Sequence, residues 1–159
     1  MLYRFDNRQP AIGKHTYVSN TAEVIGNVII GDNCYIGHGA ILRGDYGYIE
    51  IGDGSAVEEG VIIYAAPNEM CTIVKNVTIG HGAIVHAKLI HDMAVIGMGA
   101  IVSVGAEIGV WAIVDEGCVV KMNQVILPVY SMTYDASKKS FDTLLLRTMV
   151  LEKAHFFWG

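Results

Sequence analysis

The sequence has few charged residues, little proline and no long apolar run. Only 17% of its 159 residues are charged and 52% are hydrophobic, a balance that excludes an intrinsically disordered chain. Its composition is also unlike that of a collagen or a coiled coil, because 18 glycines stand against 3 prolines without a fixed three-residue or seven-residue period. Apolar runs are broken within a few residues by charge or glycine, so we expect no segment that spans a membrane and no membrane partner.

An excess of positive charge is also missing. Eleven Lys and Arg face 16 Asp and Glu, which gives a formal net charge of −5 and argues against nucleic acid as a partner. Charged residues interrupt the first ten positions, so they do not form a basic-then-apolar leader, and we expect a cytoplasmic protein. The three cysteines, Cys34, Cys71 and Cys118, are odd in number and far apart. They are typical of buried thiols in a reducing compartment.

What the sequence does contain is a six-residue repeat of aliphatic side chains. A period of six is neither the 3.6 of an amphipathic helix nor the 2 of a β-strand, so neither element explains it alone. The residue after the aliphatic position is often glycine, as in Gly31, Gly80 and Gly97. The repeating positions are Ile12, Val18, Val24, Ile30, Ile36, Leu42, Ile79 and Val85 and, after a one-residue slip, Ile90, Ile96, Val102, Ile108, Val114, Val120 and Ile126.

This period predicts an all-β solenoid of very short strands. One aliphatic side chain in six points into a narrow prism, three hexads complete a triangular coil, and coils stack about 4.8 Å apart. The hexad pattern resembles the left-handed parallel β-helix, an exception to right-handed parallel crossovers. Residues 12–126 predict roughly five to six coils, and we assign residues 1–128 to the β-helix domain.

Two insertions and a tail depart from the repeat. Three extra residues fall within 45–48 and four within 67–70, and both predict small loops at coil corners, where function often resides. Residues 129–159 predict a connector and a C-terminal α-helix. Ser140 is a candidate N-cap of this helix, whose few charges indicate packing on the solenoid or on a neighbouring subunit.

Stacking turns sequence positions into two rows of polar side chains, which we expect near one edge of the prism. His81 and His86 are five residues apart around a corner, so they diverge, and one chain cannot close a tetrahedral site with both. Two copies of the chain can, and a triangular prism favours a closed homotrimer with three equivalent sites. The first row is His38, Glu59 and His81, and the second is Arg43, Tyr64 and His86.

Four stretches of the chain resemble the gamma-class carbonic anhydrase-like proteins of the hexapeptide-repeat superfamily. They read Leu-Arg-Gly-Asp at 42–45, Glu-Gly-Val-Ile-Ile at 59–63, Ile-Gly-His-Gly-Ala-Ile-Val-His at 79–86 and Ile-Gly-Met-Gly-Ala-Ile-Val at 96–102. The resemblance covers roughly residues 10–126. It implies a left-handed β-helix trimer with a C-terminal helix alongside, and a zinc or iron ion held between subunits by three His.

Carried over residue by residue, the resemblance makes His86 a metal ligand from one chain and His81 the ligand from its neighbour. Arg43 and Asp45 match the family's Arg-Asp pair beside the site. The third His of the family is Tyr64 in this chain.

Two further departures lie in the same coil as Tyr64. The family's Asn is Ala56, and its Gln, which helps to arrange substrate and solvent, is Glu58. A phenol with a pKa near 10 must lose its proton before it binds metal, so Tyr64 is a weaker ligand than neutral imidazole. Glu58 or Glu59 could supply a carboxylate ligand in its place, which would reduce the metal's ability to acidify water.

Three functions remain open at this stage. In the first, a zinc enzyme hydrates CO2 to bicarbonate, with Arg43, Asp45, Glu58 and Tyr64 as candidate catalytic residues and Glu69 passing protons. In the second, the protein is an acyltransferase or thioesterase for a CoA thioester, with His81 or His86 as general base and Tyr64 orienting the substrate. In the third, it is a trimeric scaffold or small-molecule binder without catalysis, since a fold does not determine function.

Overall fold

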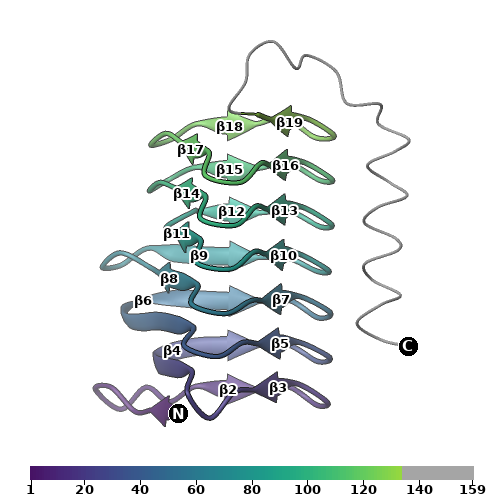
Figure 1. Ribbon diagram of the computed structural model, residues 1–159. Coiled ribbons are helices and arrows are strands. Elements are labelled where there is room, and N and C mark those ends of the chain that lie inside the picture. The colour runs from purple at the N-terminus through teal and green to yellow at the C-terminus, as the bar shows by residue number, and fades with distance from the viewer. Residues whose placement is uncertain (134–159) are drawn as a thin grey trace.

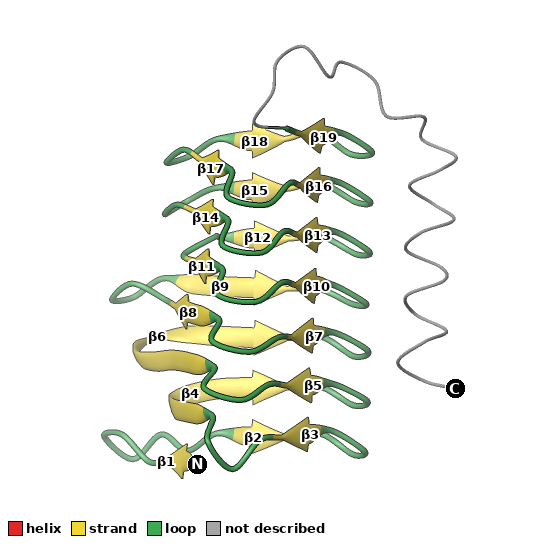
Figure 2. Ribbon diagram, viewed as in Figure 1, coloured by secondary structure: helices red, strands yellow, loops and turns green. Residues whose placement is uncertain are grey.

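The computed structural model describes residues 1–133, which form one stack of short parallel strands (Figure 1). The strands pair into a 12-stranded and a 7-stranded sheet, and each turn of chain lies above the one before it. This confirms the predicted solenoid, and the arrangement is consistent with a left-handed β-helix. Residues 1–133 contain strands, turns and loops but no helix, as Figure 2 shows. The predicted C-terminal helix lies outside the described residues.

The strands lie on three faces, with seven strands on each, so residues 1–133 make about seven turns. Residues 12–126 make about six of them, in agreement with the five to six coils predicted for that stretch. Strands β4 (Glu23–Ile30) and β6 (Ile41–Ile51) bend around a corner and belong to two faces. The first face also holds β1 (Leu2–Tyr3), β8 (Ile62–Tyr64), β11 (Ile84–Val85), β14 (Ile101–Val102) and β17 (Val119–Val120). The second holds β2 (Ala11–Ile12), β9 (Met70–Ile73), β12 (Leu89–Ile90), β15 (Glu107–Ile108) and β18 (Val125–Ile126). The third holds β3 (Tyr17–Val18), β5 (Tyr35–Ile36), β7 (Ala56–Val57), β10 (Thr78–Ile79), β13 (Val95–Ile96), β16 (Ile113–Val114) and β19 (Ser131–Met132).

The core is a set of aliphatic columns inside the prism. Leu42 pairs with Ile63 and Ile63 with Val85, and all three side chains are fully buried. Each such side chain contributes about 1.5–3 kcal/mol when removed from water. Smaller residues fill the position two places earlier in most hexads, with Ile49 as an exception. Cys34, Cys71 and Cys118 all occupy that position, buried and unpaired, as predicted.

Glycine allows the coils to approach each other closely. A Cβ added at Gly97 would lie 2.6 Å from the backbone carbonyl carbon of Asp115 in the next coil, closer than real Cβ contacts. The glycine that follows the aliphatic position therefore allows the coils to stack this closely.

Both insertions have the predicted lengths. Gly26 pairs with Gly44, and Val28 pairs with Ile49. One residue of β4 lies between these two pairs, whereas four residues of β6 do, so β6 has three extra residues. This insertion does not form the expected loop, because β6 continues through it as a bent strand that projects from the corner (Figure 1). The second insertion includes a turn at residues 67–68 between β8 and β9.

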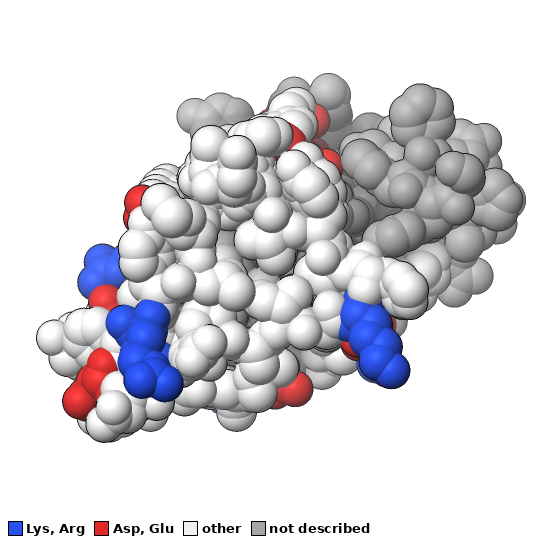
Figure 3. Space-filling model, turned by 90° about the horizontal axis from the view of Figure 1, so that it is seen from below, with Lys and Arg blue, Asp and Glu red and all other residues white. Residues whose placement is uncertain are grey.

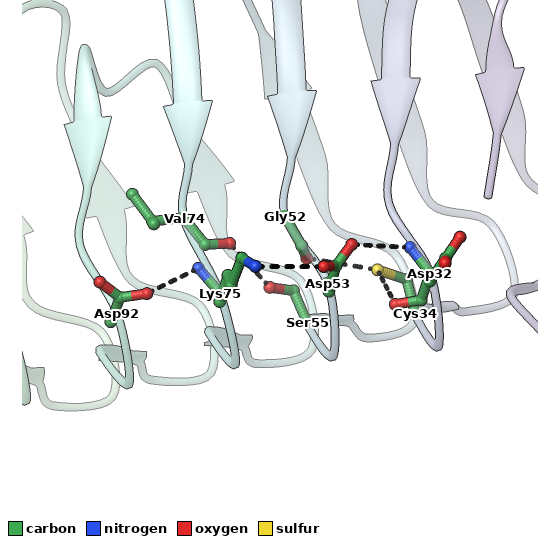
Figure 4. A network of polar contacts seen from close by, with 8 residues as sticks. All are labelled: Asp32, Cys34, Gly52, Asp53, Ser55, Val74, Lys75 and Asp92. Atoms are coloured by element: carbon green, nitrogen blue, oxygen red, sulfur yellow. Dashed lines mark hydrogen bonds and ion pairs between the residues drawn. The ribbon is translucent and has the colours of Figure 1, made fainter. Parts of the chain in front are cut away.

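The corner between the second and third faces is held by a ladder of carboxylates. Asp32, Asp53 and Asp92 each accept a hydrogen bond from a backbone N–H of the coil below, at 2.6, 2.9 and 3.2 Å (Figure 4). Asp53 also pairs with the Nζ of Lys75 at 3.3 Å. The backbone donor of Asp32 and then the Lys75 ammonium lower the pKa of the Asp53 carboxyl. At this corner the carboxylates therefore accept hydrogen bonds from backbone N–H groups that, within a straight strand, would be donated to backbone carbonyls.

The next residue at this corner adopts a left-handed backbone in every coil. The left-handed region suits Asn and Gly and is unfavourable for branched or bulky side chains. Val129, at φ 60°, is therefore a strained position. The row is His15, Asn33, Gly54, Asn76, Met93, Trp111 and Val129, with φ between 55° and 70°.

Regular structure continues beyond residue 128, because β19 pairs with β16. Within residues 1–133 no helix is long and apolar enough to cross a membrane.

We expect Val129→Asn to stabilise the solenoid by about 1 kcal/mol, because Asn tolerates the left-handed backbone that costs a β-branched residue about 1–2 kcal/mol. Urea unfolding followed by circular dichroism measures the change. Val125→Asn is the matched control, since Val125 is an exposed strand residue of β18 at which Asn brings no such relief. Equal effects of the two substitutions would contradict the strain at Val129.

Candidate functional site

The row of Arg43, Tyr64 and His86 follows the strands of the first face. Arg43 pairs with Tyr64 in the ladder of β6 and β8, and the ring of Tyr64 lies edge-to-face with His86 at a centroid distance of 5.2 Å. The guanidinium of Arg43 lies over the Tyr64 ring, 5.1 Å from its centroid. Burial lowers the pKa of His86, which favours the neutral imidazole that binds metals. The predicted row of Arg43, Tyr64 and His86 is therefore confirmed.

Arg43 and Asp45 form the predicted pair. The Nη2 and Nε of Arg43 donate to Oδ2 of Asp45 at 2.7 and 3.2 Å. The Asp45 side chain is only 8% exposed, whereas that of Arg43 is 46% exposed. The hydrogen bond from Arg43 to Asp45 raises the pKa of the guanidinium, which stays charged. Part of the Arg43 guanidinium therefore remains available to an anion.

The row of His38, Glu59 and His81 lies before the start of the same strands. Nδ1 of His81 is 2.8 Å from Oε2 of Glu59, and Nε2 of His81 is 3.2 Å from Oε2 of Glu58. Tyr35 donates its hydroxyl hydrogen to Oε1 of Glu59 at 2.6 Å. This bond lowers the pKa of Glu59, and the same bond raises the pKa of Tyr35 to about 12. Glu58 and His81 are therefore brought together by the fold.

His81 faces two carboxylates with its two ring nitrogens. A neutral imidazole carries one N–H, so it donates to only one carboxylate and turns a lone pair toward the other. The contacts with Glu59 at 2.8 Å and with Glu58 at 3.2 Å therefore cannot both be hydrogen bonds donated by a neutral ring. With Glu59 accepting from Nδ1, the free lone pair is on Nε2, toward Glu58. This is the orientation of a histidine that binds a metal or acts as a base.

The two rows do not lie near one edge, as the sequence had suggested. His81 precedes β11 and His86 follows it, so the rows lie at the two ends of the strands of the first face. Residues 81 and 82 form the turn at one corner, and the whole of β11 separates that turn from His86. Within one chain the two His therefore cannot share a metal ion.

A complete metal site is not formed by one copy of residues 1–133. No three His, Cys, Asp or Glu side chains among them converge to hold a metal. Glu69 lies apart from the other candidates: it lines an open groove on the second face, and the lining of this groove contains none of the other predicted site residues. Glu107 of this groove pairs with Lys88 at 2.8 Å.

Sequence reasoning missed Tyr35 and Arg8. Tyr35 lies on β5, 24 residues before Glu59 in the sequence, so no local motif connects the two residues. The hexad register alone would have placed them on successive coils. Arg8 donates from Nη1 to the backbone oxygen of Asp45 at 3.2 Å. It precedes the repeat, so no periodicity could locate it.

Comparisons with known proteins agree with the repeat. The family described as Bacterial transferase hexapeptide (six repeats) matches residues 10–44. Gamma carbonic anhydrase 2, mitochondrial, from Arabidopsis thaliana is 33% identical over 123 residues, which are 74% of this chain and 44% of that protein. The Carnitine operon protein CaiE of Escherichia coli is 38% identical over 112 residues, 70% of this chain and 57% of CaiE.

The chain thus spans about half the length of these curated relatives. A crystal structure of a hexapeptide transferase family protein from Anaplasma phagocytophilum superposes with a TM-score of 0.83 at 24% identity, covering 100% of this chain and 97% of that one, which shows the shared fold. Together with the hexad columns and the seven-turn solenoid, these matches show a hexapeptide-repeat solenoid that is similar to gamma carbonic anhydrase 2 and to CaiE.

Proposed function

We propose that this protein is a trimeric, metal-dependent enzyme of the carbonic anhydrase type that hydrates CO2 to bicarbonate. The observation that carries the proposal is the position of His81, whose Nδ1 is held by Glu59 while Nε2 faces Glu58 at 3.2 Å. Two electron-rich groups face each other there, and a divalent cation would satisfy both. The similarity to gamma carbonic anhydrase 2 of Arabidopsis thaliana supports the class of reaction.

The residues present fit a changed ligand set. The three His implied by the resemblance are not available, because the third is Tyr64, whose ring lies between Arg43 and His86. Glu58 takes its place: two His and one carboxylate are an established set for zinc and for iron. His81 and Glu58 of one subunit, with His86 of a neighbour, would hold the ion, and zinc is the first expectation.

The metal, when bound, supplies a Lewis acid that makes water acidic near neutral pH. The chain's own groups prepare the site. Glu59 fixes the tautomer of His81 and is itself fixed by the Tyr35 hydroxyl. Burial favours the neutral form of His86, so its lone pair is available. Arg43, held by Asp45, presents positive charge where bicarbonate would form.

A homotrimer follows from the separation of His81 and His86 at opposite ends of one face. Between them, that face turns a column of aliphatic side chains outward, of which Ile101 and Val119 are 39% and 49% exposed. Such a face is suited to packing against the edge of a second prism, which would bring His86 of one chain to His81 of the next. The column is Ile41, Ile62, Ile84, Ile101 and Val119. The cytoplasmic location remains a prediction from the sequence.

We expect Glu58→Gln to lower zinc affinity by roughly tenfold or more, since Gln keeps the shape of Glu but loses the charged ligand. The measurement is metal per chain by plasma mass spectrometry, on untagged full-length protein dialysed against defined free zinc. Glu116→Gln is the matched control, because Glu116 is exposed and lies at the same corner three coils further along.

Wild-type protein should contain about one zinc or iron per chain. Its absence after zinc is added back would refute the carbonic anhydrase proposal.

We expect Tyr64→His to raise zinc affinity by about tenfold and to raise CO2 hydration with it, because it adds an imidazole beside His86. Stopped-flow pH-indicator assays measure hydration, and competition with a fluorescent zinc chelator measures affinity. Tyr64→Phe, which removes only the hydroxyl, should change neither. Unchanged affinity in Tyr64→His would show that position 64 does not face the metal.

A second candidate function is transfer or hydrolysis of an acyl group from a CoA thioester. The observation that favours it is the Glu59–His81 pair, in which a carboxylate orients an imidazole as in a general base. His81 would take the proton of an attacking water, amine or hydroxyl as the new bond to the acyl carbon forms. The carbon–sulfur bond then breaks, and the proton passes to the thiolate of CoA. The family name, Bacterial transferase hexapeptide, supports this class.

If this function holds, metal-free wild-type protein should release thiol from acetyl-CoA, and His81→Gln should reduce the rate by about 100-fold or more. A thiol-reactive dye follows the release. His91→Gln is the control, because His91 follows β12 at a different corner. Neither thiol release nor CO2 hydration in any preparation would leave the third reading, a trimeric scaffold or binder.

A further inference from the structure

We propose that Arg8 and Arg43 form a binding subsite for a small planar oxyanion, bicarbonate or a carboxylate, at the corner occupied by Tyr64 and His86. Arg8 belongs to no repeat, and no function considered above assigns it a role. The subsite does not require the metal, so it stands or falls separately from the proposed function.

Both guanidinium groups contact the same residue. Arg8 donates to the backbone oxygen of Asp45 at 3.2 Å, and Arg43 donates to its carboxylate at 2.7 Å. Two positive charges therefore meet one buried negative charge, which leaves an excess of one positive charge. Asp6, in the turn before Arg8, is the nearest other acidic residue along the chain.

Each Arg keeps donors for a ligand. A guanidinium has five N–H donors, and the contacts with Asp45 engage two of the nitrogens of Arg43 and one of Arg8. Both residues are exposed to solvent on one side. Planar guanidinium groups match the geometry of a planar oxyanion through paired hydrogen bonds. Bicarbonate and carboxylates share this geometry, whereas phosphate is tetrahedral.

The position of Arg8 is built by a hairpin between β1 and β2. Phe5 and Arg8 exchange two backbone hydrogen bonds of 2.9 Å, around a turn in which Asp6 and Asn7 have φ of 45° and 63°. Positive φ at both central residues is typical of a tight hairpin turn. Phe5 also packs edge-on against Tyr46, at a centroid distance of 5.2 Å. The hairpin therefore contacts the inserted segment of β6 at two points, Phe5 on Tyr46 and Arg8 on Asp45.

The surroundings of the hairpin leave the subsite open and largely uncharged. In Figure 1 the hairpin and the bent part of β6 project from the same side of the solenoid, one above the other. The end of the molecule near the hairpin is mostly uncharged, with basic and acidic side chains at its margins (Figure 3). The shared contact with Asp45 therefore carries the argument that Arg8 and Arg43 act together.

The test is a titration of the full-length chain with sodium bicarbonate or sodium acetate, at constant ionic strength with chloride. The arginine Nε–Hε signals in a ¹⁵N spectrum report binding directly. Wild-type protein should show saturable shifts, and Arg8→Gln should bind about tenfold more weakly, since it loses a charge-assisted hydrogen bond. Arg8→Lys should recover part of the affinity. Arg4→Gln, on the same hairpin, is matched in charge and should leave affinity unchanged.

Three results would overturn the subsite: equal affinity in wild-type protein and Arg8→Gln, equal shifts with chloride alone, or loss of binding when a chelator removes metal. The last result would mean that the anion binds the ion. Stronger shifts with bicarbonate than with acetate would connect the subsite to CO2 hydration, and the reverse would connect it to an acyl product. Persistence of binding in metal-free protein supports the subsite even if the carbonic anhydrase proposal fails.

Discussion

The parallel stacking of inward-facing aliphatic side chains is the constraint on which every other feature of this protein depends. Leu42, Ile63 and Val85 lie directly above one another and are fully buried. Each coil is too short to bury its own apolar side, so its stability comes from the coils above and below. The columns fix the register of successive coils. A residue that lies a given number of positions from a column residue in the sequence therefore has a fixed place in the stack. Polar side chains thereby gain precise positions without contributing to the core.

The candidate site uses that register in two ways. Tyr64 and His86 are neighbours because Ile63 and Val85 are neighbours, and His81 reaches Glu59 for the same reason one corner earlier. A single prism cannot bring these two groups together, since the strands of the first face separate them. The candidate site residues are therefore divided between the two ends of the first face. An apolar column between them is suited to the second subunit that would complete the site.

Departures from the repeat carry much of the remaining specificity. The three extra residues of β6 place Asp45 under Arg43 and expose its backbone oxygen to Arg8. At the opposite corner the repeat is kept even where the residue suits it poorly, as at Val129 with φ 60°. The backbone strain at Val129 is tolerated, and the insertion in β6 is held by one ion pair and one hydrogen bond to Asp45. Both indicate that stacking outweighs local conformational preference in this chain.

The sequence by itself determined the solenoid, the two insertion lengths, the buried cysteines and the membership of both polar rows, because a period of six converts counting into spatial position. It did not determine where the rows lie relative to each other: they lie at opposite ends of the first face, and counting residues gives register but not the direction in which a corner turns. Nor could it find the contacts of Arg8 with Asp45 and of Tyr35 with Glu59. Those contacts depend on side chains that meet across coils and across a hairpin outside the repeat. Only the packed structure brings such groups within hydrogen-bonding distance.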